Sequence, residues 1–358
     1  MSQTGLNSQV TGEKYQRNIW LALIFAIIAV AGVFYVKWNP YYHKVFIAAA
    51  KHSIGASIIS GKTNVPPAPS WAAAWSFTVG YFKSVWEAVV LGILLGSLVQ
   101  VLIPTDWVIR MFNRTSFGSA AAASALAVPS MMCTCCAAPV TVGLRKQQAS
   151  VGSSLAFWLA NPVLNPATII FMGFVLSWKY AILRIVVGVI LIFAIAPLGD
   201  KWADATQLSD NVIAEAQPAS SSDEGNLVVR WLRALGVLII DTIPAYLIVV
   251  FVLGAARAWL FPVLTPAWDN SIIVLITLAI AGALFVIPTA GEVPIIQTLL
   301  SFGLGVGPAA ALLITLPAIS LPSIMIVKRV FTWRILAFTT ATVVVAGILA
   351  GFAANLLF

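Results

Sequence analysis

Long runs of apolar residues, separated by short polar segments, dominate this chain. Most of these runs reach about 18 residues, the length a helix needs to cross the hydrocarbon core of a bilayer. The predicted runs are Asn18–Val36, Ser84–Ile103, Val151–Phe174, Trp178–Pro197, Trp231–Leu260, Ile272–Ile287, Pro308–Val327 and Arg334–Leu357. A shorter alanine-rich helix is predicted at Ser116–Val128. The pattern therefore predicts an all-α polytopic membrane protein.

The first apolar run stands apart because a polar lead precedes it. Residues 1–16 are polar, and we expect them to be disordered. The spanning helix Asn18–Val36 has no small-residue cleavage site after it, which indicates an anchor and not a cleaved signal peptide. Residues 39–80 mix aromatic, basic and proline residues, and are predicted to form an interfacial segment that ends in a stiff linker. Residues 1–80 thus form one unit of tail, transmembrane helix and interfacial segment.

The rest of the chain contains an internal repeat. A shift of 155 residues matches Pro139 with Pro294, Val151-Gly152 with Val306-Gly307, Pro162 with Pro317, and Trp178-Lys179 with Trp333-Arg334. We interpret these matches as two homologous halves, residues 84–198 and 231–357, joined by the polar linker 199–230. Repeats around broken helices are typical of transport folds. The simpler alternative is coincidence, because proline and glycine are common in membrane helices.

The relative orientation of the halves depends on how the Ser116–Val128 helix crosses the membrane. If this helix and the cysteine segment after it form a re-entrant hairpin, each half crosses three times and the halves are inverted. The loop lysines and arginines then share one side with the N-terminus, as the positive-inside rule favours. If the helix crosses fully, the halves are parallel and this bias nearly vanishes. Ile272–Ile287 is apolar enough to span alone, which favours the parallel reading; we favour inverted halves.

Composition narrows the class of protein. The chain is 60% hydrophobic and 9% charged, whereas a soluble domain carries roughly 25% charged residues. The net charge of +8 is spread over short segments between helices. It therefore indicates contact with membrane lipid and not with nucleic acid. The sequence contains no nucleotide-binding loop and no Ser-His-Asp set, so we expect no cofactor and no enzyme activity. The expected location is the cell (inner) membrane.

All three cysteines lie together in Cys133-Thr-Cys135-Cys136. The structural breaks Pro129 and Pro139 frame them and argue against a continuous helix through the cluster. On irregular backbone the three sulfurs could converge. Thiolates bind soft ions such as Cu(I) and Zn, and by the same chemistry trivalent arsenic. We therefore predict a substrate or soft-metal site at these cysteines. The alternative is that each cysteine is a small apolar packing residue.

A second cluster, Asn161-Pro162-Val-Leu-Asn165-Pro166, interrupts the third apolar run. Each proline removes a backbone donor, which frees a carbonyl in the preceding turn. In hydrocarbon such groups need a partner or a water-lined cavity. We therefore predict helix breaks at Pro162 and Pro166, with Asn161 and Asn165 binding substrate. The alternative is a kinked packing helix.

Glu292 is the acid of greatest interest, because the repeat places it opposite Ala137, beside the cysteines. It precedes the predicted break at Pro294. We predict that it contacts substrate and carries protons, since burial disfavours an ionised acid. An equal alternative is that it satisfies free N–H groups around Pro294. The remaining charges in apolar surroundings are expected to be interfacial: Glu87, Arg184 and Asp241.

The run from Cys133-Thr-Cys135-Cys136-Ala-Ala-Pro139 to Gly143-Leu-Arg145-Lys146 resembles the predicted permease family that includes the organoarsenical efflux permeases. The Asn161–Pro166 cluster and Ser320-Leu-Pro-Ser323 are also similar, and the resemblance covers roughly residues 84–350. It implies an integral membrane permease, some relatives of which export trivalent organoarsenicals. Cys136 departs from the family pattern, in which glycine is more usual, and this extra thiol leaves room for a different soft ligand.

Three functions are compatible with these features. The first is an efflux permease for a soft, thiol-reactive or sulfur-containing solute, coupled to protons. The second is a membrane thiol oxidoreductase that uses Cys133 and Cys136, although no second cysteine pair exists to relay electrons. The third is a non-transporting subunit of a membrane complex. A second copy of the chain is a further candidate partner. The state of the thiols separates the first two, because only an oxidoreductase should cycle a disulfide.

Overall fold

The computed structural model describes residues 3–59, 67–112, 117–206, 226–261 and 271–358, and every regular element in these ranges is helical. The elements are α1 Gln3–Val33, the π-helical turn η1 Phe34–Trp38, α2 Asn39–Lys51, α3 Trp71–Leu102, α4 Thr105–Phe112, α5 Phe117–Ala127, the 3₁₀ turn η3 Val128–Ser130, α6 Thr134–Lys146, α7 Val151–Val163, α8 Pro166–Val175, α9 Trp178–Thr206, α11 Leu227–Leu260, α12 Ile272–Leu284, α13 Glu292–Ser301, α14 Val306–Ala318, α15 Leu321–Val327 and α16 Trp333–Leu357. Within the described ranges, seven helical segments are long and apolar enough to cross a membrane. The chain is therefore a polytopic α-helical membrane protein, as predicted.

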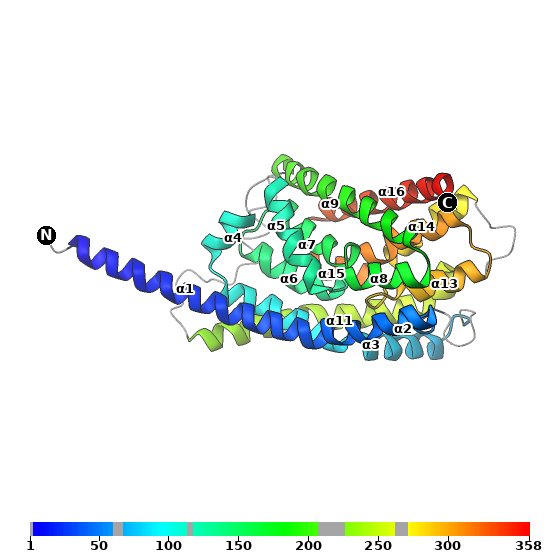
Figure 1. The fold of residues 1–358 in the computed structure, drawn as a ribbon. Helices are drawn as coiled ribbons and strands as arrows, with labels where there is room; N and C mark the ends of the chain where they lie inside the picture. The colour runs from blue at the N-terminus through cyan, green and yellow to red at the C-terminus, as the bar shows by residue number, and fades with distance from the viewer. Residues whose placement is uncertain (1–2, 60–66, 113–116, 207–225, 262–270) are drawn as a thin grey trace.

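The helices form an outer shell around a central group. In Figure 1, α3 and α11 run along one side of the molecule and α9 and α16 along the other, with α6, α7, α14 and α15 between them. Every residue of α7 is buried, as are all residues of α14 except Val306. Many side chains of α9, α11 and α16 instead face outward and are apolar. This distribution is expected for helices whose outer faces contact lipid.

Two of the central helices are broken near their middles. The chain leaves helical geometry at Leu164–Asn165, between α7 and α8, and again at Ile319–Ser320, between α14 and α15. Pro166 begins α8, as the sequence predicts, because the first helical position needs no N–H donor. Pro162 differs from the prediction, since it lies inside α7 just before the break.

The cysteine segment returns to the end of the molecule from which it starts. The Ser150 N–H donates to the Phe112 carbonyl over 2.9 Å, so the chain before α5 and the chain after α6 are in contact. Helix α6 runs through Pro139, contrary to the break predicted there. Close packing supports it, because a Cβ atom at Gly92 of α3 would lie 2.2 Å from the Cys136 carbonyl oxygen. Pro129, in contrast, lies in the short turn before the irregular residues, and Pro294 lies within the start of α13.

Helices α9 and α16, whose first residues are separated by the 155-residue shift, run in opposite directions. The ring of Tyr180 near the start of α9 lies 5.1 Å from that of Phe358 at the C-terminus. At the other end, the ring of Trp202 stacks 4.8 Å from that of Phe338 near the start of α16. Helix α12 has 13 residues, a length of about 20 Å, which is too short to span a bilayer alone.

Several boundaries differ from those predicted. Helix α1 begins at Gln3, within the lead expected to be disordered, and η1 and α2 extend the same rod to Lys51. Helix α3 starts at Trp71 and not at Ser84. Helix α9 continues to Thr206, so the start of the predicted linker is helical, while residues 207–225 lie outside the described residues. In each case the helix extends beyond the apolar run that predicts it, because elongation of an existing helix costs little and the isolated Gly12, Gly80 and Gly199 do not stop it.

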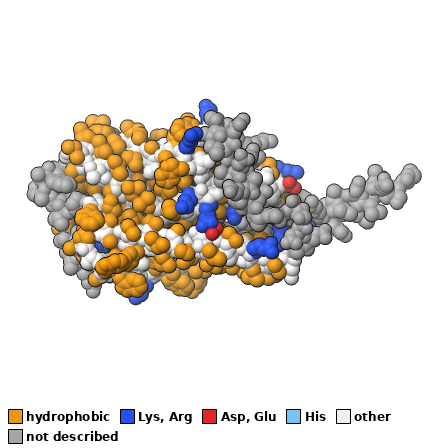
Figure 2. Space-filling view, turned by 180° about the vertical axis from the view of Figure 1, so that it is seen from behind, with side chains coloured by type: hydrophobic (Ala, Val, Ile, Leu, Met, Phe, Trp, Pro, Cys, Tyr) orange, Lys and Arg blue, Asp and Glu red, His pale blue; other side chains and the backbone are white. Residues whose placement is uncertain are grey.

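Basic side chains gather where α6 and α15 end. The guanidinium of Arg145 lies 5.8 Å from the ring centre of Phe331, and Arg329 forms a 2.5 Å ion pair with Asp241 of α11. Figure 2 shows lysine and arginine side chains gathered in one part of a face, with hydrophobic side chains over most of the remainder. This separation of charge from apolar surface is expected of a protein whose apolar belt lies in a bilayer.

Candidate functional site

A small pocket, with room for about one water molecule, lies where the interrupted helices meet. Its lining residues are Met132, Cys133, Thr134, Pro162, Asn165, Thr168, Ile287, Pro288, Thr289, Ala290, Glu292, Leu316 and Pro317. Four of them stand 155 positions before four others: Met132, Cys133, Thr134 and Pro162 before Ile287, Pro288, Thr289 and Pro317. The irregular segments before α6 and α13 thus face each other across the pocket.

The three cysteines do not converge on one point. Cys133 caps the N-terminus of α6 and lines the pocket. It forms a disulfide with Cys136, with 5.3 Å between the two Cα atoms. Cys135 is a free, buried thiol. Successive helical residues are turned by about 100°, which explains why Cys135 leaves the face that its neighbours share. Within the described residues, no group of three or more His, Cys, Asp or Glu side chains is arranged to hold a metal ion.

Cys135 belongs instead to a buried polar cluster behind the pocket. Its sulfur lies 3.4 Å from Ser320 Oγ, at the break in the second half, and that oxygen lies 3.3 Å from Thr134 Oγ1. The Tyr81 and Tyr246 hydroxyls, which share a 2.7 Å hydrogen bond, lie close to the same thiol. The cluster joins α6 to α15 and to the outer helices α3 and α11. Sequence reasoning missed both tyrosines, because each reads as an aromatic residue within an apolar run.

The two asparagines predicted to bind substrate have different positions. Asn161 Oδ1 accepts hydrogen bonds from Ser130 Oγ and from the Met132 N–H, and its Nδ2 donates to the Phe157 carbonyl over 2.9 Å. It does not line the pocket, and it fixes the backbone just before Cys133. Asn165 does line the pocket, and its Oδ1 caps α8 by accepting the Thr168 N–H over 3.2 Å.

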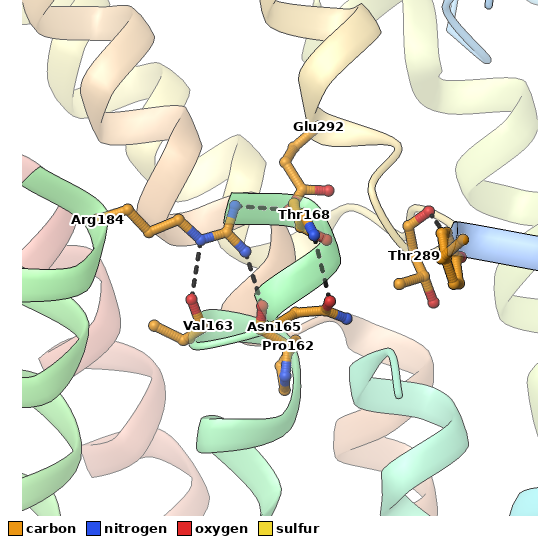
Figure 3. A network of polar contacts seen from close by, with 8 residues as sticks. Pro162, Val163, Asn165, Thr168, Arg184, Thr289 and Glu292 are labelled. Carbon is orange, nitrogen blue, oxygen red and sulfur yellow. Dashed lines mark hydrogen bonds and ion pairs between the residues drawn. The ribbon is translucent and has the colours of Figure 1, made fainter. Parts of the chain in front are cut away.

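Glu292 forms a buried ion pair with Arg184, in which Arg184 Nη1 lies 2.7 Å from Glu292 Oε1 (Figure 3). Arg184 also donates to the Val163 carbonyl over 2.9 Å and to the Pro162 carbonyl over 2.7 Å. One guanidinium thus donates to the last carbonyls of the broken helix α7 and pairs with the carboxylate at the start of α13. The interfacial position predicted for Arg184 is wrong, because its side chain is fully buried.

The other two charged side chains are more exposed than those of Arg184 and Glu292. Glu87 is exposed on α3, and Asp241 is partly exposed in its pair with Arg329. Only the Arg184–Glu292 pair is therefore held inside the bundle and beside the pocket. Its position follows from the break in α7, which leaves two carbonyls that need a donor.

The N-terminal rod contacts both irregular segments at the pocket. Trp38 Nε1 donates to the Pro129 carbonyl over 2.7 Å, on the cysteine side. On the opposite side, Lys37 Nζ donates to Thr289 Oγ1 over 2.9 Å. Lys37 is 4% exposed, so this cation is buried at the pocket wall. The sequence signal for it was one lysine at the end of an otherwise apolar run, but its partner is 252 residues away.

Comparison with known proteins agrees with this architecture. Residues 70–356 match the ArsP_1 family model, described as a predicted permease. The UPF0718 protein YraQ of Escherichia coli (strain K12) is 48% identical over 332 residues, covering 93% of this chain and 94% of YraQ. The UPF0718 protein MJ0584 of Methanocaldococcus jannaschii is 24% identical over 306 residues, covering 68% of this chain and 84% of MJ0584. No solved structure is significantly similar to this chain.

Proposed function

Because this chain belongs to the predicted permease family, we propose that it is a cell-membrane permease whose cargo is a soft, thiol-reactive or sulfur-containing solute. The observation that carries the proposal is the position of Cys133 in the wall of a pocket between broken helices. Reduction of the Cys133–Cys136 disulfide would present the Cys133 thiol to that pocket. On a trivalent arsenical, the Cys133 sulfur would replace a hydroxide or thiolate ligand of the arsenic, which leaves with the thiol proton as water or free thiol, and the reverse exchange would release the solute. A trivalent arsenical is the cargo suggested by the family resemblance, and efflux is the direction.

We further propose that the two halves are inverted repeats that rock about this pocket. The antiparallel course of α9 and α16 supports inversion, as do the return of the chain to Phe112 after α6 and the short α12. Alternation of access would then require the breaks in α7 and α14 to change their mutual contacts. The Arg184–Glu292 pair, which joins α9 to α13 beside these breaks, is a further contact between the halves.

Inversion predicts that Arg145 and Lys328 face the same compartment as the N-terminus, the cytoplasm. Single cysteines placed at Lys328 and at the exposed Gln148, three residues after the buried Arg145, in a cysteine-free background should both be labelled by an impermeant maleimide only in inside-out vesicles. A cysteine at Trp178, at the start of α9, should react only in right-side-out vesicles. Opposite labelling of positions 148 and 328 would rule out inverted halves.

Transport of a panel of solutes into inside-out vesicles tests the function itself. The panel contains phenylarsine oxide as a trivalent arsenical, Cu(I), thiosulfate, and sulfate as a hard anion without a soft atom. We expect saturable uptake of at least one soft solute, inhibition by thiol oxidants, and no uptake of sulfate. A reduced wild-type protein that moves none of the soft solutes would contradict the permease assignment.

The disulfide favours a second candidate, a membrane thiol oxidoreductase. In that reaction a substrate dithiol would pass two electrons and two protons to the Cys133–Cys136 disulfide, and a membrane quinone would then reoxidise the pair. The thiol state separates the two functions. An oxidoreductase should alternate between dithiol and disulfide with each turnover, whereas a permease should transport with both cysteines reduced throughout. A non-transporting subunit would do neither.

A further inference from the structure

The pocket contains a buried hydrogen-bond donor that has no acceptor. Asn165 is fully buried, and its Oδ1 is held by the Thr168 N–H (Figure 3). The hydrogen bond to Oδ1 identifies the other amide atom as nitrogen, and this Nδ2 has no hydrogen-bond partner. A buried donor left unpaired costs about 1–3 kcal/mol. An acceptor atom on a bound solute would remove that cost.

Three helices present their N-terminal ends to the same space. The first residues of α6, α8 and α13, or the residues that cap them, line the pocket: Thr134, Asn165 and Glu292. Helix N-termini carry a partial positive charge and free N–H groups, which attract anions. The C-terminal end of α7 carries a partial negative charge. Its last carbonyls already accept hydrogen bonds from Arg184.

Lys37 adds a positive charge next to this pocket. Its ammonium donates to Thr289 Oγ1, and Thr289 is one of the lining residues. Of the described carboxylates, none lies within 4 Å of Lys37, and Glu87 acts on it only from a distance. Glu292, the charged residue of the pocket lining, is paired with Arg184.

From these groups we infer that the solute is an oxyanion, with a negative charge and acceptor oxygens next to its soft atom. Asn165 and the Lys37–Thr289 pair bind the oxygens, and Cys133 meets the soft atom. The inference deepens the proposed function and rests on it only for the role of the thiol. The N-terminal rod, which lies wholly outside the residues 70–356 that match the family model, thereby becomes part of the substrate site.

Two substitutions test the inference in purified full-length protein in nanodiscs, with affinity measured by thermal stabilisation. Lys37→Met removes the charge and keeps the length of the side chain; Lys44→Met, on the exposed side of the same rod, is its control. Asn165→Asp keeps the oxygen that caps α8 and replaces the donor with an acceptor. Its control is Asn226→Asp, which caps α11 on the surface by accepting the Val228 N–H.

Thiosulfate is the anionic probe and phenylarsine oxide the neutral one. We expect each test variant to lower the ratio of thiosulfate affinity to phenylarsine oxide affinity by about tenfold or more, because each loses a hydrogen bond to a charged group. The controls should leave this ratio within about twofold. An unchanged ratio in Lys37→Met, or failure of wild-type protein to bind thiosulfate, would overturn the inference.

A cysteine-free variant separates this inference from the function on which it rests. Its donor groups are intact, so it should still bind sulfate or thiosulfate with the same dependence on Lys37. If it does so while the wild-type protein transports no soft solute, the oxyanion site stands and the permease assignment fails. If transport of phenylarsine oxide is normal but no anion binds, the permease assignment stands and the oxyanion site is wrong.

Discussion

Substituting serine for Cys133 is expected to abolish transport of a soft solute while the protein stays folded and inserted. Serine has nearly the same size, and a hydroxyl is a hard oxygen ligand that does not replace a thiolate. Cys133 is the cysteine that lines the pocket, so its sulfur is the one a solute can reach. Uptake of phenylarsine oxide into inside-out vesicles, compared at equal protein levels, measures the effect.

The other two cysteines supply controls with different expected results. Cys136→Ser should leave the Cys133 thiol permanently reduced, so transport should persist and lose its sensitivity to thiol oxidants. Cys135→Ser should have a small effect, because a hydroxyl can keep the contact with Ser320 behind the pocket. Normal transport by a protein with no cysteine at all would show that the soft-ligand mechanism is wrong.

The course of the helices was predictable because a bilayer imposes strict lengths on apolar runs. The break at Pro166 was predictable as well, since proline at the first helical position and asparagine as its cap have local physical reasons. The break predicted at Pro139 was wrong, because that prediction considered only the local effect of proline. A proline costs one hydrogen bond, and tight packing of α3 on α6 offsets that cost in a way that no local rule anticipates.

The site itself depends on contacts that a single sequence does not reveal. Arg184 and Glu292 are 108 residues apart, and each reads as an isolated charge near the end of an apolar run. Asn165 lines the pocket, whereas its neighbour Asn161 does not and holds the backbone before Cys133. That difference depends on which side of α7 faces the pocket, which is set by how the halves pack.

Neutralising Glu292 is expected to reduce stability and to uncouple transport from pH. In Glu292→Gln the amide oxygen can still accept from Arg184, but the guanidinium loses the only carboxylate within 4 Å among the described residues. Removing one partner of a buried ion pair typically costs about 3–5 kcal/mol. The double variant Arg184→Met/Glu292→Leu leaves no unpaired charge at this position, but the Pro162 and Val163 carbonyls lose their donor, so it should recover only part of that loss. Asp241→Asn, in the exposed pair with Arg329, should cost about 1 kcal/mol or less.

The same pair carries the proposed coupling to protons. We propose that loss of the Glu292 charge breaks the ion pair between α13 and α9 and allows the two halves to move. Uphill transport driven by a pH gradient should therefore be lost in Glu292→Gln, while downhill exchange of the solute persists. The double variant should melt at a higher temperature than Glu292→Gln without recovering uphill transport, which separates coupling from stability. Uphill transport by Glu292→Gln with an unchanged pH profile would make Glu292 structural and place the coupling group elsewhere.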